Sequence, residues 1–101
     1  MLSFFKRLFQ QSYEGLEKAF QKGAVIVDVR TKSEYQQGHV ADSKNIPLNE
    51  IKIKLDTIRK WNKPVITVCR SGSRSAMAKN LLKSAGIEVY NGGAWTSLNR
   101  K

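Results

Sequence analysis

Two short, mainly apolar segments constrain the fold of this chain more than any other feature. They are residues 24–29, Ala-Val-Ile-Val-Asp-Val, and residues 65–68, Val-Ile-Thr-Val. Both are rich in β-branched side chains and lack the alternation of apolar and polar residues that marks a strand with one wet face. Such strands are covered on both faces, as parallel strands in α/β proteins are. A third strand is predicted over residues 87–90, and strands alternating with helices indicate a mainly parallel sheet between two helical layers.

Helices are predicted where apolar residues recur at intervals of three and four. Gly23 and Gly86 are placed to end two of them, because glycine readily adopts the left-handed conformation found just after a helix. From the last helix we expect Met77, Leu81 and Leu82 to face the core. The expected helices span residues 13–21, 48–60 and 73–85.

The length of the chain fits a single domain. Its 101 residues are enough to bury one core without disulfides or metals. We place the domain at residues 13–101, after an N-terminal amphipathic extension at residues 1–12. No stretch reaches the roughly 20 apolar residues of a membrane span, and the first residues lack the pattern of a secretory signal. We therefore expect a cytoplasmic protein that packs its extension on itself and not on a membrane.

Positive charge is concentrated in the second half of the chain. The net charge is +10, from 18 Lys and Arg against 8 Asp and Glu. Residues 1–50 carry seven basic and six acidic residues, whereas residues 51–101 carry eleven and two. A basic surplus by itself attracts anions of any kind. Because no aromatic platform or base-reading motif accompanies it, we expect a small anionic substrate and an acidic protein as partners, and not nucleic acid.

The chemistry-bearing segment follows the second apolar segment directly. The sequence predicts that Cys69 lies at the carboxyl end of a buried strand and just before a helix N-terminus, where unpaired N–H groups attract anions. Gly72 lets the loop curl those groups toward one point, while Arg70 and Arg74 add positive charge. A thiol in this setting ionises more readily than a free cysteine, so Cys69 is the candidate nucleophile. The segment reads Cys69-Arg70-Ser71-Gly72-Ser73-Arg74-Ser75.

The cysteine count narrows the chemistry further. Cys69 is the one cysteine of the chain, which excludes an internal disulfide and a multi-cysteine zinc site. We expect neither a metal nor another cofactor.

Five motifs, in this order, resemble the single-domain rhodaneses, a family of sulfurtransferases. The resemblance covers about residues 13–101 and implies the rhodanese fold, a three-layer α/β/α sandwich around a mostly parallel five-stranded sheet. The motifs are Asp28-Val29-Arg30, residues 34–40 (Glu-Tyr-Gln-Gln-Gly-His-Val), Asn45-Ile46-Pro47, the Cys69 segment, and the turn Asn91-Gly92-Gly93 followed by Trp95.

The resemblance also implies a reaction and roles for the residues around it. The Cys69 thiolate would take a sulfane sulfur from thiosulfate or a similar donor, become a persulfide, and pass the outer sulfur to a thiol or to cyanide. The loop would hold the donor and the persulfide through Arg70, Ser71, Gly72, Ser73, Arg74 and Ser75. Asp28 and Arg30 would support the site from beneath, and His39 would be structural.

Two alternatives stay open at this point. The chain could be a sulfur-carrier or protein-interaction module without independent turnover, or a cysteine phosphatase or arsenate reductase. Phosphatases that share this fold place five residues between the cysteine and the arginine of the loop, whereas four separate Cys69 from Arg74. The shorter loop favours sulfur transfer, because a phosphate needs a wider ring of donors.

Overall fold

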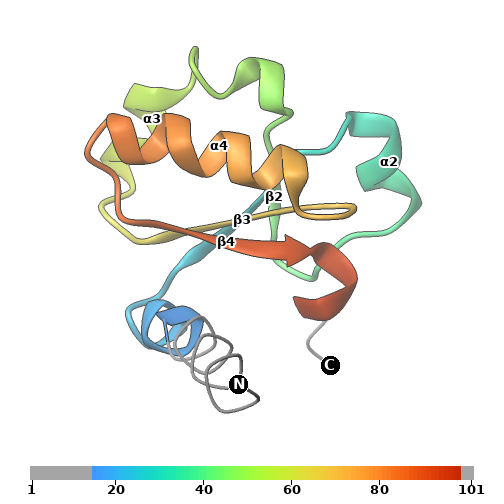
Figure 1. Ribbon diagram of the computed structural model, residues 1–101, viewed down its shortest axis with the longest axis horizontal. Helices are drawn as coiled ribbons and strands as arrows, with labels where there is room; N and C mark the ends of the chain where they lie inside the picture. The colour runs from blue at the N-terminus through green and yellow to red at the C-terminus, as the bar shows by residue number, and fades with distance from the viewer. Residues whose placement is uncertain (1–14, 99–101) are drawn as a thin grey trace, which may run out of the picture.

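A parallel sheet forms the centre of the protein, of which the computed structural model describes residues 15–98 (Figure 1). The strand order is β2-β1-β3-β4, and each neighbouring pair is parallel. The two apolar segments form the central strands β1 and β3, as predicted. The strands of the described residues are β1 (Val25–Asp28), β2 (Lys44–Asn45), β3 (Val65–Cys69) and β4 (Val89–Ala94).

The resemblance implied five strands, and the described part of the chain contributes four. The segment before β1 is a helix up to residue 21, because Leu16 and Phe20 lie one turn apart and pack on the core together. The segments between the strands are helices and turns. β4 and β2 are therefore the two edges of the described sheet.

Helices and single turns of 3-10 helix connect the strands. Gly23 and Gly86, each with φ +81°, follow two of the helices as predicted. The Ala24 N–H donates to Ala19 O (3.0 Å), and the Ile87 N–H donates to Leu82 O (3.1 Å), which completes the usual closure of a helix C-terminus. No helix among residues 15–98 has the length and apolar character to cross a membrane. The elements are α2 (Lys32–Gln37), η1 (Leu48–Glu50), α3 (Leu55–Lys60), α4 (Ser73–Ser84) and η2 (Trp95–Leu98).

Three predictions about local structure were wrong. The single helix expected over residues 48–60 is divided into η1 and α3, because the segment between them, with β-branched Ile51 and Ile53, favours turns over continuous helix. Met77 is 58% exposed, since α4 turns Ala78 and Leu82 toward the sheet instead. Asn91, Gly92 and Gly93 lie inside β4 and do not form a turn.

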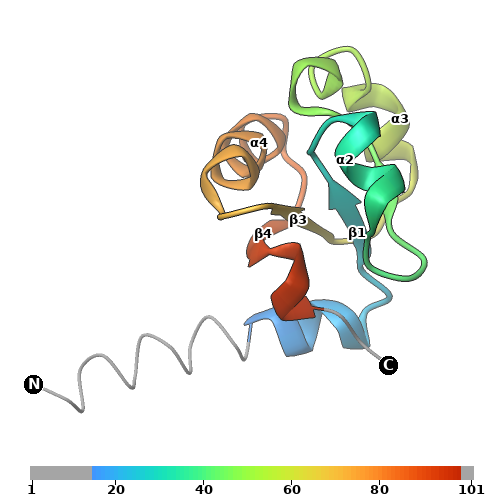
Figure 2. The same ribbon diagram turned by 90° about the vertical axis from the view of Figure 1, so that its right-hand side faces the viewer.

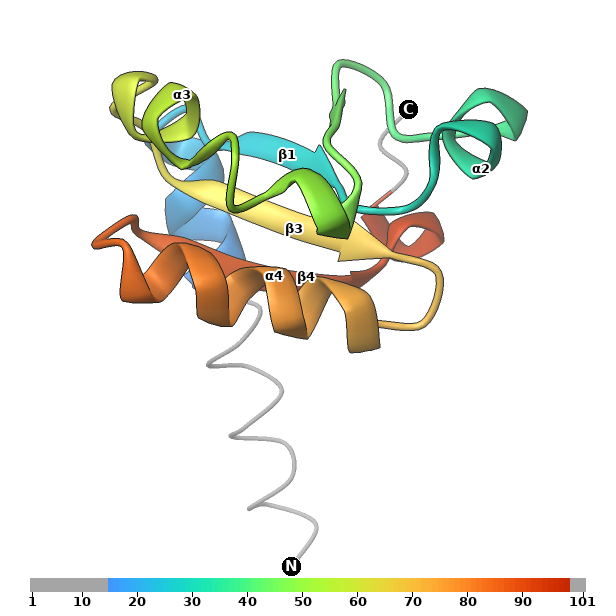
Figure 3. The same cartoon turned by 90° about the horizontal axis from the view of Figure 1, so that it is seen from above.

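Two apolar clusters cover the two faces of the sheet, which is the three-layer arrangement that the sequence predicts. Successive residues of β1 supply both, with Val27 on the face covered by α3 and α4 and Ile26 on the opposite face. Helix 15–21 and η2 lie on that opposite face (Figure 2). Because the strands are parallel, their last residues, Asp28, Cys69 and Ala94, all lie at the carboxyl end of the sheet, next to α2 (Figure 3).

Candidate active site around Cys69

Cys69 is the last residue of β3, and its side chain lies in the loop that leads into α4. The residue is 1% exposed. Gly72 has φ +106°, a left-handed conformation that turns its N–H back toward the strand. This N–H donates to Cys69 Sγ at 3.0 Å, so the loop curls around the sulfur as the sequence predicts.

The surroundings of Cys69 favour the thiolate. Burial is the largest single influence and opposes ionisation, but the Ser75 hydroxyl and the N–H groups of Ser75, Gly72 and Ser71 outweigh it and lower the pKa of the thiol. The neutral thiol donates to Ser75 Oγ at 3.4 Å, and once the thiol ionises the single proton of the Ser75 hydroxyl can turn toward the sulfur. A lower pKa increases the fraction of thiolate, which is the nucleophilic form of cysteine.

Asn91 holds the loop in shape from the neighbouring strand. Its Oδ1 accepts from Ser75 Oγ at 2.6 Å and from the Gly93 N–H at 2.9 Å, and its Nδ2 donates to Gly72 O at 3.2 Å. The side chain therefore ties β4 to the loop and to the first turn of α4. The sequence analysis gave Asn91 no role of its own. Its contacts depend on the register between β3 and β4, which cannot be predicted from the sequence.

Arg74 is bound to α2. Its guanidinium donates to Glu34 Oε1 at 2.7 Å and to Oε2 at 3.0 Å. The Arg74 hydrogen bond is the largest cause that lowers the pKa of Glu34 to about 2, and the Thr31 N–H adds to it. Glu34 also completes a capping box with Thr31 at the start of α2. The Glu34 carboxylate thus fixes the helix α2 to the cysteine loop.

Arg70 is the exposed cation of the loop. It lines a cavity of about 380 Å³ together with Arg30, Glu34, Gln37, Gly38 and Trp95. Ser71 and Ser73 are exposed beside it, and no side-chain hydrogen bond of either is present among the described residues. The cavity lies where an anion would meet the positive charge of Arg70.

Asp28 and Arg30 form a buried ion pair at the end of β1. Their side chains are 0% and 5% exposed, and Arg30 Nη2 donates to Asp28 Oδ2 at 2.7 Å and to Gly38 O at 2.7 Å. The guanidinium also lies over the Trp95 ring, 4.6 Å from its centroid. Arg30 therefore connects β1, the end of α2 and η2 at the cavity that it lines.

His39 lies outside this network. Its ring stacks on Tyr35 with centroids 3.8 Å apart, and its Nδ1 lies 2.8 Å from Tyr35 O. These contacts support the structural role expected for it.

The family described as Rhodanese-like domain matches residues 12–96. The chain is 39% identical over 69 residues to "Thiosulfate sulfurtransferase PspE" of Escherichia coli (strain K12), which covers 66% of this chain and 66% of that protein. It is 33% identical over 63 residues to "Putative sulfur carrier protein YrkF" of Bacillus subtilis (strain 168), covering 62% of this chain and 34% of that protein. The chain thus spans less than two thirds of either relative.

A solved structure with the same fold is "rhodanese with anions from E. coli". It superposes with a TM-score of 0.67 at 36% sequence identity, over 72% of this chain and 88% of that chain.

Proposed function

Because this chain belongs to the rhodanese-like domain family, we propose that it is a sulfurtransferase whose Cys69 carries the sulfur as a persulfide. The observation that carries the proposal is the Gly72 N–H at 3.0 Å from Cys69 Sγ, in a loop whose hydrogen bonds lower the pKa of the thiol. The two relatives named above act, by their names, on thiosulfate and as a sulfur carrier. Both names fit a cysteine that accepts and releases sulfur.

In the first step the Cys69 thiolate attacks the sulfane sulfur of thiosulfate. A new S–S bond forms at Cys69, the S–S bond of thiosulfate breaks, and sulfite leaves with that electron pair. The charge is unchanged, since a thiolate and a dianion give a persulfide anion and a dianion. The positive charge of Arg70, beside the cavity, attracts the dianion.

In the second step the acceptor attacks the outer sulfur of the persulfide. Cyanide gives thiocyanate, and a thiolate gives a new persulfide; in each case the bond between the two sulfurs breaks and Cys69 leaves as a thiolate. The hydrogen bonds from the loop stabilise that thiolate as it forms. No proton donor is needed, which fits a site where His39 is engaged by Tyr35.

The position of Arg74 argues against phosphatase chemistry. A phosphate in such a loop needs a guanidinium whose charge faces its oxygens, whereas the charge of Arg74 is balanced by the Glu34 carboxylate, which binds one N–H of Nη1 and one of Nη2.

A sulfur carrier without turnover is the second candidate, favoured by the YrkF relative. Intact-protein mass and the transfer of sulfur from thiosulfate to cyanide separate the two. A gain of one sulfur atom with thiocyanate turnover supports the enzyme, and the same gain without turnover supports the carrier. Cys69→Ala should lose both readouts. Full activity in Cys69→Ala, with circular dichroism unchanged, would show that the proposed mechanism is wrong.

A further inference from the structure

A bulge in β4 aims the side chain of Asn91 at the cysteine loop. The register between β3 and β4 shifts there by one residue, so that Gly92 is the extra residue on β4. Gly93 has φ +75°, and its N–H donates to Asn91 Oδ1 at 2.9 Å. Bulges of this kind redirect a side chain next to a site. The Asn91 amide therefore meets Ser75 and Gly72 of the loop.

The two ends of the Asn91 amide are distinguished by their partners. Oδ1 is an acceptor for the Gly93 N–H, and Nδ2 donates to Gly72 O at 3.2 Å. The reverse orientation would set two donors against each other at one end and two acceptors at the other. An acceptor oxygen thus lies 2.6 Å from Ser75 Oγ, and the Ser75 hydroxyl donates to it.

The Ser75 hydroxyl has one proton and several acceptors for it. The side chain is buried, and its Oγ lies 2.6 Å from Asn91 Oδ1, 3.0 Å from Gly72 O and 3.4 Å from Cys69 Sγ. While Cys69 is a neutral thiol, its S–H donates to Ser75 Oγ and the hydroxyl proton is directed to the nearest acceptor, Asn91. Once the thiol has lost its proton, Sγ is an anion that competes for the same hydroxyl proton.

We propose that Asn91 is a positioning residue whose Oδ1 accepts the Ser75 proton while Cys69 Sγ carries no charge. When the thiol proton leaves to water, the hydroxyl keeps its own proton and turns it from Oδ1 to Sγ. Oδ1 retains the Gly93 N–H, and Gly72 O retains the donor from Asn91 Nδ2. The turn therefore leaves neither acceptor without a donor, and Asn91 opposes ionisation only through its contact with Ser75.

The same exchange accompanies the proposed sulfur-transfer cycle, on which this inference rests. In a persulfide the negative charge lies on the outer sulfur and Sγ has no formal charge, so the hydroxyl proton returns to Asn91. When an acceptor removes the outer sulfur, Sγ leaves as a thiolate and the proton turns to it again. The direction of the Ser75 hydroxyl thus follows the charge of Cys69.

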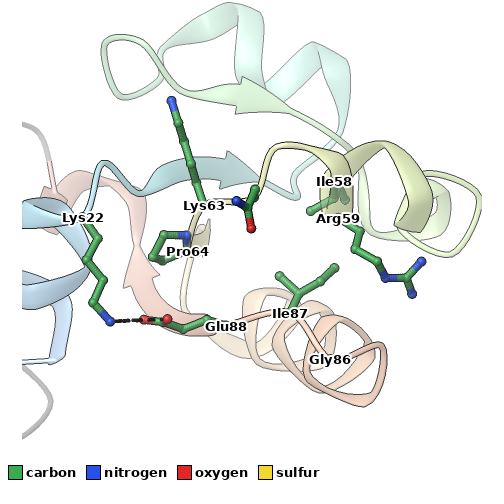
Figure 4. A pocket seen from close by; sticks show the side chains of 9 residues that line it. Lys22, Ile58, Arg59, Lys63, Pro64, Gly86, Ile87 and Glu88 are labelled. Carbon is green, nitrogen blue, oxygen red and sulfur yellow. Dashed lines mark hydrogen bonds and ion pairs between the residues drawn. The ribbon is translucent and has the colours of Figure 1, made fainter.

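The fixed charges near Cys69 stay the same during this exchange. Strand β4 adds one titratable group, the Tyr90 hydroxyl, which donates to Glu88 at 2.7 Å. Glu88 precedes β4 and so lies at the other end of the sheet, where Figure 4 shows its carboxylate extended to the Lys22 ammonium. The charged groups of the loop and of the elements that meet at it are Arg70, Arg74 with its partner Glu34, and Asp28 with its partner Arg30.

The test is the pH dependence of alkylation of Cys69 in the full chain, which needs no sulfur donor. Asn91→Ala removes the competing oxygen, so the ionisation constant of the thiol should increase about two- to tenfold, as expected for one hydrogen bond gained by the thiolate. A role in loop shape alone predicts the opposite sign, because a loosened loop loses the N–H groups that stabilise the thiolate. The matched control Tyr90→Phe removes a hydrogen bond from the same strand and should leave the constant at the parent value.

Contacts that do not involve Asn91 should keep Ser75 in place in this variant. Thr67 Oγ1 donates to Ser75 O at 2.9 Å, and the Ala76 N–H donates to Gly72 O at 3.1 Å. Asn91→Ser is a second variant, since its oxygen is one bond closer to the backbone and farther from Ser75 Oγ. It should change the ionisation constant in the same direction. Circular dichroism shows which variants are folded.

The double variant Ser75→Ala/Asn91→Ala shows whether the effect passes through the hydroxyl. Compared with Ser75→Ala alone, it should have the same ionisation constant. The inference fails if either folded Asn91 variant lowers the constant or leaves it at the parent value, or if the increase persists without Ser75. Absence of thiocyanate formation alongside the expected alkylation results would instead overturn the proposed function alone.

Discussion

The guanidinium of Arg74 forms two parallel hydrogen bonds with the carboxylate of Glu34, at 2.7 and 3.0 Å. The two residues are forty positions apart in the sequence, and the pair joins the first turn of α4 to the start of α2. Arg74 was expected to hold the donor together with the rest of the loop. The pairing shows that it also fixes the cysteine loop to α2, and Arg70 is the more exposed cation of that loop.

Replacing Glu34 by Gln should make stability less sensitive to acid. The pKa of Glu34 is lowered from 4.5 to about 2 in the folded state. Its contribution to the free energy of unfolding is therefore complete above pH 4.5 and is lost as the pH falls toward 2. Glu34→Gln should be less stable than the parent chain at neutral pH, and the difference should shrink between pH 4.5 and 2, measured by urea unfolding at each pH.

Asp56→Asn is the control for this experiment, since its exposed carboxylate pairs with Arg59 within one helix. Such a pair is worth only a few tenths of a kcal/mol. A difference between Glu34→Gln and the parent that stays constant down to pH 2 would contradict the assignment of the Arg74 pair.

Replacing Ser75 by Ala should raise the pKa of the Cys69 thiol. The Ser75 hydroxyl is one of the groups that lower it, and a hydrogen bond to a charged group is lost. The rate of alkylation of Cys69 at neutral pH should fall about three- to tenfold and recover at high pH.

The fold should tolerate the Ser75→Ala change, because the partners of Ser75 keep others. Asn91 Oδ1 still accepts from the Gly93 N–H, and Gly72 O still accepts from Asn91 Nδ2. If the rate of alkylation depends on pH in the same way in Ser75→Ala and in the parent chain, the hydroxyl does not lower the pKa of the thiol.

Replacing Arg70 by Gln should weaken the binding of an anionic sulfur donor more than it slows the chemical step. Arg70 is exposed at the cavity, so its charge acts on the approach of the donor. KM for thiosulfate should rise about two- to fivefold at low salt, with the difference shrinking as salt screens the charge. Lys60→Gln removes the same charge from the end of α3 and should leave KM near that of the parent chain. A drop in kcat at unchanged KM would place Arg70 in the chemical step instead.

Replacing Gly92 by Ala should destabilise the protein through crowding. A Cβ at this position would lie 2.7 Å from Leu98 Cδ1, 2.8 Å from Ile66 Cγ2 and 3.0 Å from Val68 Cγ1. Inserting a methyl group into a filled core costs about 1–3 kcal/mol. Urea unfolding should show a loss of that size.

Gly15→Ala should have the opposite effect and raise the free energy of unfolding. Its Cβ would meet the Tyr90 ring at an ordinary 3.5 Å, and Ala is favoured over Gly in a helix by about 0.5–1 kcal/mol. Equal effects of the two substitutions would mean that the space around Gly92 is not filled as described.

Elements that depend only on residues close together in the chain were predictable from the sequence. The β-branched segments of β1 and β3 specify strands buried on both faces, and Gly23 and Gly86 specify the ends of two helices. The order of strand, cysteine loop and helix likewise placed Cys69 at the carboxyl edge of a parallel sheet. Each of these follows from periodicity or from backbone conformation within a few residues.

Tertiary structure alone decided which distant groups meet at that edge. The partner of Arg74 is on α2, and the side chain that ties the loop together, Asn91, is on β4; both contacts depend on strand order and register. The exposure of Met77 was decided in the same way, because α4 turns Ala78 and Leu82 toward the sheet. A side chain buries or pairs according to what the sheet presents to it, and no spacing along the chain contains that information.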